Sequence, residues 1–119
     1  DNFINVISQS KIGLNLSQGK TAKYYSSDRF AQLVGNGLMV MIDEKTQFND
    51  FFDNDEIITY NNINDLSEKI IKYSHDDKLR KKIAKKGRDK YFKYFNSTII
   101  ADFIIKKAFN INHKKFYWE

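Results

Sequence analysis

The 119-residue chain has no cysteine and no proline, and its only histidines are His75 and His113. Without cysteine it can form no disulfide, no thiolate metal site and no cysteine nucleophile. Two histidines alone cannot complete a metal site, which would need carboxylates as further ligands. No apolar run approaches the ~20 residues that a membrane-spanning helix requires, and no signal-peptide pattern follows Asp1. These absences predict a cytoplasmic setting, and a first residue other than Met predicts a fragment of a longer protein.

The residues that are present are sufficient for one folded domain. Hydrophobic residues make up 41% of the chain and aromatic residues 15%, which is enough for a packed core. Residues 1–60 carry 5 basic and 8 acidic groups, whereas residues 61–119 carry 15 basic and 7 acidic groups. The positive charge is concentrated between Lys78 and Lys93, where nine basic residues accompany a single acid, Asp89. Such a stretch is typical of a solvated helix face, and it can also bind an anionic partner.

Apolar spacing predicts strands that alternate with helices. Residues 11–16 alternate as in a half-buried strand, and Leu38 to Ile42 form the continuous apolar run of a strand covered on both faces. Ile57 to Tyr60 predict a third strand. Strands separated by helical segments require right-handed crossovers and a parallel sheet. The predicted fold class is therefore α/β: a partial Rossmann-like three-layer domain with a parallel sheet of about three strands and C-terminal helices, over residues 1–109.

Capping residues mark the ends of the predicted helices. Ser27 is a suitable N-cap, Asp28 follows it in the first turn, and Gly37 closes the same helix in a left-handed conformation. Asn64 is predicted to cap the next helix, and Asp76 or Asp77 to start the one after it. A final helix follows a break near Asn96 and Ser97. Residues 110–119 form a tail whose aromatic residues, Phe116 to Trp118, predict docking.

The loop from Ser17 to Asp28 is the predicted binding site. In open parallel sheets, ligands bind at the carboxyl ends of the strands, beside helix N-termini. The unpaired N–H groups of such a helix end suit a phosphate, and Lys20, Lys23 and Arg29 would add positive charge. The alternative is an ordinary polar crossover loop with surface lysines.

Three motifs that could carry chemistry do not have the spacing or position that the chemistry requires. Gly19-Lys20-Thr21 imitates the end of a P-loop, but five residues separate Gly13 from Gly19 where the pattern requires four. Asp53, Asp55 and Glu56 form an acidic cluster without the spacing of a calcium loop. His75 and the two aspartates after it fit capping better than metal binding. No metal site is predicted.

Several segments resemble the C-terminal region of group 1-type glycosyltransferases, and most closely the spore-maturation (CgeB-type) branch. The segments, which keep the order and spacing of that region between Lys11 and about Phe95, are Lys11–Ser17, Ser27–Phe30, Leu33, Gly37–Val40, Asp65-Leu66, Leu79–Ala84 and Gly87-Arg88. The resemblance implies a two-domain GT-B fold in which this region binds a nucleotide-sugar donor. It also implies an acceptor-binding domain outside the chain, no cofactor, and usually no bound metal.

The resemblance also indicates which residues meet the donor and where the chain departs from the family. The wider family carries two glutamates separated by seven residues, and the matching positions here are Tyr24 and Gln32. An amide accepts a hydrogen bond from a ribose hydroxyl more weakly than a carboxylate does. The expected donor-binding residues are Ser17, Lys20, Lys23, Tyr24, Ser27, Asp28, Arg29 and Gln32. The catalytic residues stay unassigned.

The predicted function is therefore the nucleotide-sugar-binding part of a glycosyltransferase, which would be inactive without its acceptor domain. The alternative is a non-catalytic basic module that binds nucleic acid or an anionic membrane through the Lys78–Lys93 helix. The membrane is the more expected of these two partners, because no aromatic residues interleave with the lysines as in a single-strand stacking platform.

Overall fold

The computed structural model describes residues 2–17 and 19–119, which form a parallel sheet covered by helices. The elements, in chain order, are α1 (Asn2–Gln9), β1 (Ile12–Asn15), α2 (Asp28–Gly35), β2 (Met39–Asp43), the 3-10 turns η1 (Glu44–Thr46) and η2 (Phe48–Asp50), β3 (Ile58–Tyr60), α3 (Ile63–His75), α4 (Asp77–Tyr94) and α5 (Ser97–Ala108). The predicted α/β class, with its small three-stranded parallel sheet and C-terminal helices, is confirmed. No helix within the described ranges is long and apolar enough to cross a membrane.

The sheet has the strand order β1-β2-β3, so β2 is central. In the parallel register Gly13 lies beside Val40, and Met41 lies beside Ile58. The residues from Met39 to Ile42 are at most 1% exposed, because helices cover both faces of this strand. Their continuous apolar run is therefore the consequence of burial on two sides.

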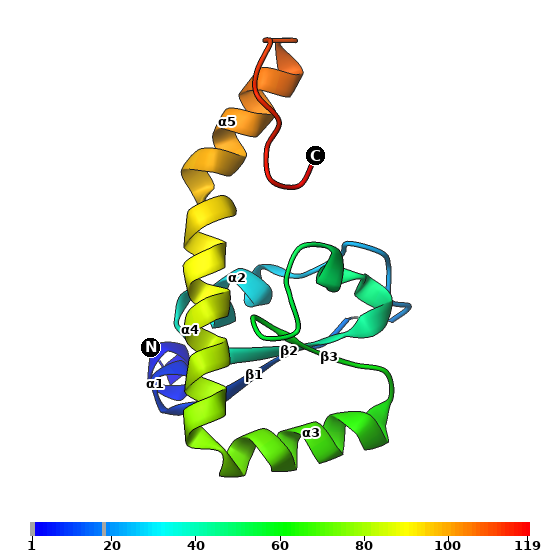
Figure 1. Cartoon of the computed structure of the whole chain (residues 1–119), viewed down its shortest axis with the longest axis vertical. Coiled ribbons are helices and arrows are strands. Elements are labelled where there is room, and N and C mark those ends of the chain that lie inside the picture. Colours follow the sequence, from blue (N-terminus) through cyan, green and yellow to red (C-terminus); the bar gives the residue numbers. More distant parts are fainter. Residues whose placement is uncertain (1, 18) are drawn as a thin grey trace.

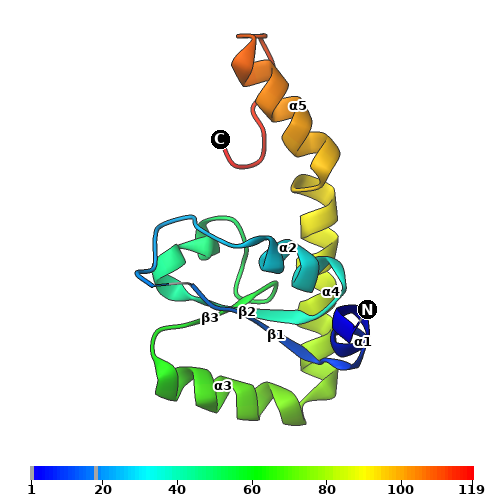
Figure 2. The same cartoon turned by 180° about the vertical axis from the view of Figure 1, so that it is seen from behind.

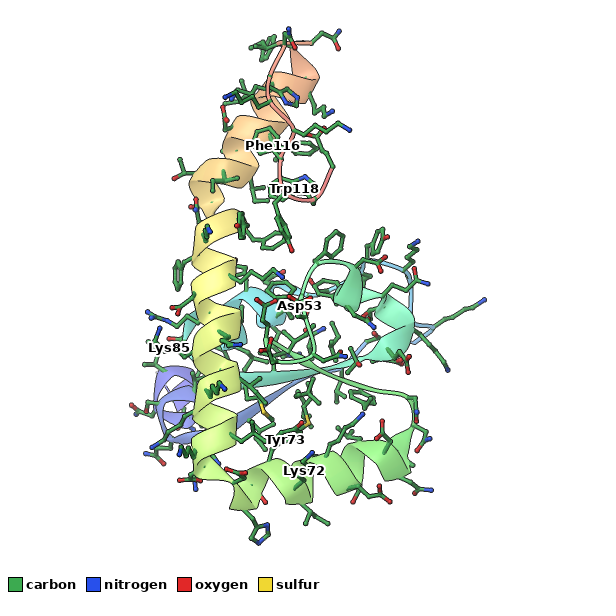
Figure 3. The ribbon with its side chains drawn as sticks, in the orientation of Figure 1. Asp53, Lys72, Tyr73, Lys85, Phe116 and Trp118 are labelled. Carbon is green, nitrogen blue, oxygen red and sulfur yellow. The ribbon has the colours of Figure 1, made fainter. Side chains whose placement is uncertain are left out.

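Two hydrophobic clusters lie on opposite faces of the sheet. On one face, Val40 and Ile42 pack with residues of α2 and η2. On the other face, Met39 and Met41 pack with residues of α3 and of the first half of α4, among them Tyr73, which points from α3 toward the sheet (Figure 3). Figures 1 and 2 show the resulting three layers, with α2 and α3 on opposite sides of the strands. The alternation of side chains along β2 divides the core in this way.

Helix α4 joins the two layers at the edge of the sheet where β2 and β3 begin (Figure 1). Ile83 and Ala84, in its first half, belong to the α3 side of the core, whereas Tyr91, in its second half, packs against the α2 side. Gly87 lies between them, and a Cβ added there would be 2.2 Å from the carbonyl oxygen of Glu56. Only glycine allows the helix and this backbone to approach so closely.

The helix ends confirm most of the predicted caps. Gly37 has φ +80°, and the N–H of Leu38 donates to the carbonyl of Leu33 at 3.1 Å, which together form a Schellman closure of α2. Asp76 caps α4 by accepting from the N–H of Leu79. The prediction for α3 was wrong by two residues, because Asn62 is the cap.

Asn62 caps α3 with a side chain that the sequence alone did not single out. Its Oδ1 accepts from the backbone N–H groups of Asn64 and Asp65 at 2.9 and 3.0 Å. Three asparagines, Asn61, Asn62 and Asn64, shortly precede Asp65, so more than one position could have supplied the cap. The end of β3 at Tyr60 decides which asparagine stands at the start of the helix.

The tail docks as predicted, through aromatic stacking against α5 and the end of α4. The ring of Trp118 stacks on Phe95 with centroids 5.4 Å apart, and Tyr117 stacks on Tyr94 at 4.3 Å. Phe116 meets Phe103 of α5 edge-on at 5.3 Å. Figure 3 shows Phe116 and Trp118 pointing from the tail toward these helices.

We predict that Gly87→Ala destabilises the protein by about 1–3 kcal/mol, because the new methyl group overlaps the backbone of Glu56. Gly35→Ala is the matched control, since the nearest atom to a Cβ there is 4.0 Å away in the ring of Phe92. Urea denaturation of both variants measures the difference. Equal stabilities of the two variants would contradict the close contact.

Candidate functional site

The carboxyl ends of the three strands form a polar edge opposite α4. Asn15 ends β1, Asp43 ends β2, and Asp43 lies beside Tyr60 of β3 in the register. The loop that follows β1 crosses this edge: Thr21 donates its hydroxyl to Oδ2 of Asp43 at 3.1 Å. Burial, together with the nearby carboxylate of Asp43, raises the pKa of Tyr60 above its ordinary value, so that hydroxyl is neutral at physiological pH.

The N-terminus of α2 also lies at this edge, and no side chain among residues 2–17 and 19–119 caps it. Ser27 occupies the N-cap position, as predicted, but its hydroxyl makes no capping bond to the helix. That hydroxyl donates instead to Oδ1 of Asn15, at 3.2 Å. Since Asn15 is only 1% exposed, the bond fixes the start of α2 to the end of β1. The N–H of Phe30 in the first turn donates to the carbonyl of Ser27 at 2.9 Å, whereas the Ser27 side chain leaves the amides of Asp28 and Arg29 uncapped at the positive end of the helix dipole.

Three predicted residues share the exposed side of this helix end. Asp28 and Arg29 stand in the first turn of α2 and Gln32 follows one turn after Asp28, all of them exposed. Arg29 and Gln32, three positions apart, lie on neighbouring parts of the helix surface. Asp28 places a negative charge beside Arg29, which favours the helix but opposes an anion at the same place.

The other predicted residues lie along the crossover loop. Tyr24, in a left-handed conformation with φ 58°, donates its hydroxyl to Oδ2 of Asp50 at 2.6 Å and packs its ring on Phe51 at 4.8 Å. The ammonium group of Lys23 lies over the Tyr24 ring, 4.5 Å from the centroid. Lys20 is exposed. Tyr24 thus anchors the loop on η2 and does not join Arg29 and its neighbours.

Ser17 stands at the start of the loop, two residues after the last residue of β1. Its hydroxyl oxygen is buried, and no hydrogen-bond partner for it exists among residues 2–17 and 19–119. The side chain therefore lies under the loop surface.

Sequence reasoning missed Asn15, the residue that positions Ser27. The apolar alternation over residues 11–16 puts Asn15 on the polar face of the strand, so the pattern gave no signal for it, whereas the structure buries that face. It also missed an apolar cavity of about 370 Å³ between α2, η2 and the end of α4. Its walls, which are mainly aromatic and include two serines and a carboxylate, are Ser26, Ser27, Asp28, Phe30, Ala31, Phe48, Phe51, Phe52, Tyr91, Phe95 and Ile100.

The P-loop-like motif does not form a P-loop. Gly13 lies within β1, where a Cβ would be 2.8 Å from the side chain of Leu33, so this glycine serves the packing of α2 on the strand. The next helix begins only at Asp28 and not directly after Thr21. The structure therefore agrees with the sequence prediction, made from the spacing of the two glycines, that this motif is not a P-loop.

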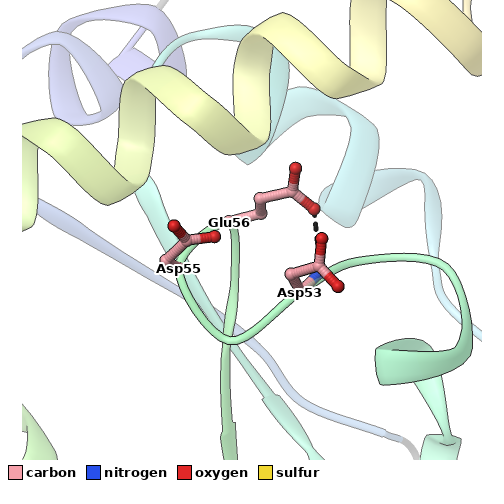
Figure 4. Close-up of side chains that lie close together, drawn as sticks. All are labelled: Asp53, Asp55 and Glu56. Carbon is pink, nitrogen blue, oxygen red and sulfur yellow. Dashed lines mark hydrogen bonds between the residues drawn. The ribbon is translucent and has the colours of Figure 1, made fainter.

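The acidic cluster before β3 is held by lysines of α4. Asp53, Asp55 and Glu56 bring carboxylate oxygens within 4.8 Å of one another (Figure 4), and Glu56 also accepts from the backbone N–H of Asp53 at 2.8 Å. Lys86 pairs with Asp55, and the ammonium group of Lys90 lies 2.6 Å from Glu56 and 3.6 Å from Asp53. The protein itself supplies the positive charge that these carboxylates require.

Lys90 is the most enclosed of these lysines, with 9% of its side chain exposed. Burial opposes its charge, but the hydrogen bonds and charge interactions with Glu56 and Tyr117 together outweigh this effect and hold the pKa of Lys90 well above its ordinary value. A raised pKa in the folded state means that the pair stabilises the protein throughout the neutral range. The stabilisation is lost only when the pH rises through the folded-state pKa, above 10.5.

Other basic residues of the Lys78–Lys93 stretch are also used within the fold. Arg80 is 4% exposed and donates to the carbonyl of Tyr73 at 3.1 Å. Arg88 donates to the carbonyl of Gly35 at the end of α2. Lys85 pairs along the helix with Asp89 and points away from the body (Figure 3). Much of the charge in this stretch therefore joins α4 to its neighbours.

Comparison with known proteins gives one finding. A family model described as "Glycosyl transferase-like" matches residues 1–106. No curated protein and no solved structure matches the chain.

We predict that Ser27→Ala costs about 1–2 kcal/mol of stability, because it leaves the buried Oδ1 of Asn15 without its donor. Ser26→Ala, at the neighbouring position of the loop, is expected to change the stability by less than about 0.5 kcal/mol. The free energy of unfolding in urea distinguishes them. If both changes have the same small effect, the Ser27–Asn15 bond does not hold the helix end.

We predict that Lys90→Met destabilises the protein by about 1–3 kcal/mol at neutral pH, since Glu56 keeps its charge in a largely enclosed position. Lys85→Met is the control, because the Lys85–Asp89 pair is exposed and its loss costs about 0.5 kcal/mol or less. The difference between the two variants, measured by thermal unfolding, should shrink as the pH approaches that at which Lys90 loses its proton. If the stability difference between the two variants stays constant up to strongly alkaline pH, the Lys90–Glu56 ion pair is not its cause.

Proposed function

Because the chain belongs to the glycosyl transferase-like family, we propose that it binds the donor of a glycosyl-transfer reaction, a nucleoside-diphosphate sugar. The family match supports a role in glycosyl transfer, and the donor class rests on the form of the polar edge. The observation that carries the proposal is the uncapped N-terminus of α2, where Ser27 turns its hydroxyl to Asn15. Helix N-termini in this position of a parallel sheet suit diphosphates.

The proposed role of this helix end is to stabilise the leaving group. When an acceptor oxygen attacks the anomeric carbon, the bond to the diphosphate breaks and negative charge develops on the phosphate oxygen. The amides of Asp28 and Arg29, which the Ser27 side chain does not cap, and the guanidinium of Arg29 would stabilise that charge. Lys20 and Lys23 on the loop would add longer-range attraction.

Gln32 and Tyr24 would act differently from the residues at the matching positions of the wider family. Gln32, one turn after Asp28, offers an amide oxygen to a ribose hydroxyl, which is a weaker acceptor than a carboxylate. Tyr24 is engaged with Asp50 and Phe51, so its proposed contribution is to hold the loop in place. We therefore expect this chain to bind the donor more weakly than relatives that keep both glutamates.

The larger architecture is part of the same proposal. A GT-B arrangement would place the acceptor on another domain, facing the polar edge across a cleft. Kinship with the spore-maturation (CgeB-type) branch remains a prediction from the motifs. Transfer would then require the whole protein, whereas donor binding would depend mainly on α2 and the loop before it.

We predict that Arg29→Ala weakens the binding of UDP- or GDP-sugar to the full-length protein by roughly tenfold, the loss typical of one charge-assisted contact. Isothermal titration without added magnesium measures it, with Lys78→Ala on the exposed side of α4 as the control of equal charge change. Asp28→Asn should act in the opposite direction and tighten binding, because it removes a negative charge beside the diphosphate. The absence of any binding that responds to Arg29 would reject the proposal.

A further inference from the structure

Residues 43–51, from the end of β2 through η1 and η2, hold the crossover loop that joins β1 to α2, and we call them the anchor segment. The hydroxyl of Thr21 donates to Oδ2 of Asp43 at 3.1 Å. The hydroxyl of Tyr24 donates to Oδ2 of Asp50 at 2.6 Å. Figures 1 and 2 show the loop running beside the anchor segment, on the side of the sheet away from α4. Two hydroxyl–carboxylate bonds therefore join the loop to this segment.

The anchor segment is itself fixed in the core. Thr46 is fully buried, and its hydroxyl donates to the carbonyl of Asp43 at 2.6 Å. Phe48 is buried and packs edge-on against Phe30 of α2, with ring centroids 4.9 Å apart. The carbonyl of Thr46 accepts the backbone N–H of Tyr24 at 2.8 Å, so Tyr24 is held by both its backbone and its side chain. The loop is thus bound to a rigid support.

The backbone of the loop is held in a strained conformation at Tyr24. Its φ of 58° lies in the left-handed region that residues with a Cβ rarely adopt. Such a conformation persists only where the surrounding contacts over-determine it, and strained residues of this kind are concentrated at functional sites. The three bonds of the loop to the anchor segment supply those contacts.

Each anchored residue follows directly after a lysine that would attract the donor. Thr21 follows Lys20, and Tyr24 follows Lys23. The ammonium group of Lys23 also lies over the Tyr24 ring, 4.5 Å from the centroid. Fixing Thr21 and Tyr24 therefore fixes the backbone from which both lysine side chains extend.

The charge of the two aspartates shows that they act on the loop and not on an anion. Carboxylates near a diphosphate oppose its binding, so Asp43 and Asp50 would not contact the donor favourably. A flexible loop loses conformational entropy when a ligand orders it, and contacts that order it beforehand remove this loss. The hydrogen bonds from the loop give the aspartates such a role.

We propose that Asp43 and Asp50 are positioning residues for donor binding. They order the crossover loop before the donor arrives and so keep Lys20 and Lys23 beside the diphosphate, without touching the donor themselves. The inference rests on the proposed function and goes beyond it, because neither aspartate is among the expected donor-binding residues.

Titration of UDP- or GDP-sugar into the full-length protein tests the positioning role. Asp50→Ala and Thr21→Val each remove one bond of the loop, and each should weaken donor binding by about three- to fivefold. The double variant should weaken it by about tenfold or more, since the two bonds are separate. Asp50→Asn keeps an oxygen that accepts from Tyr24 and should bind within about twofold of the unchanged protein. If Asp50→Ala and Asp50→Asn behave alike, charge and not positioning is the cause, and the inference is wrong.

Hydrogen–deuterium exchange without donor measures the order of the loop directly. Exchange over residues 19–26 should be faster in Asp50→Ala and in Thr21→Val, whereas exchange in α3 and the midpoint of urea unfolding should change little. Asp89→Ala is the control of equal charge change, and Thr98→Val is the control for loss of a threonine hydroxyl. Both control residues are exposed on helices, and both variants should match the unchanged protein in exchange and in affinity.

The two measurements allow the inference and the proposed function to fail separately. Unchanged exchange over residues 19–26 in Asp50→Ala and Thr21→Val would overturn the inference, even if donor binding responds to Arg29. Equal losses of affinity in the control variants would also overturn it. Faster exchange together with no donor binding to any form would instead reject the proposed function, and the positioning role with it.

Discussion

The fold depends on the close approach of α4 to the backbone just before β3. Gly87 permits this approach, since any side chain there would overlap the carbonyl of Glu56. One turn later Lys90 reaches Glu56, and between them Arg88 donates to the carbonyl of Gly35, which ends α2. A single helix thereby closes both hydrophobic layers along the edge where β2 and β3 begin. The resemblance of Gly87-Arg88 to a family motif thus has a physical basis in packing and capping.

Closing one edge of the sheet with α4 leaves the opposite edge to polar residues. There the strands end in Asn15, Asp43 and Tyr60, and the loop after β1 lies over them. The bond from Ser27 to Asn15 sets the start of α2 and keeps the serine hydroxyl from capping the helix. The same contact therefore fixes the start of α2 and, in the proposed function, would leave the amides of Asp28 and Arg29 to an anion. The Ser27–Asn15 hydrogen bond therefore matters both for the fold and for the proposed function.

Local chemistry made most of the fold predictable. The apolar run over β2, the left-handed glycine after α2 and the aromatic tail each depend on properties that a sequence pattern records directly. The cap of α3 was misplaced because several asparagines compete and only the end of β3 selects Asn62. For the site, Ser27, Asp28, Arg29 and Gln32 could be placed on one helix end from the sequence, since they are close along the chain. Tyr24 could not be placed, because its partners lie on η2.

The sequence by itself determined the parallel α/β class, the order of elements and the presence of a basic stretch at Lys78–Lys93, since these follow from the period and composition of contiguous residues. Only the tertiary structure decided the use of that charge, because the carboxylates that neutralise Lys86 and Lys90 are more than 30 positions away. It likewise decided that Asn15, and not the helix, receives the Ser27 hydroxyl. A hydrogen bond or an ion pair depends on distance in space, and spacing along a chain reports that distance only within one element.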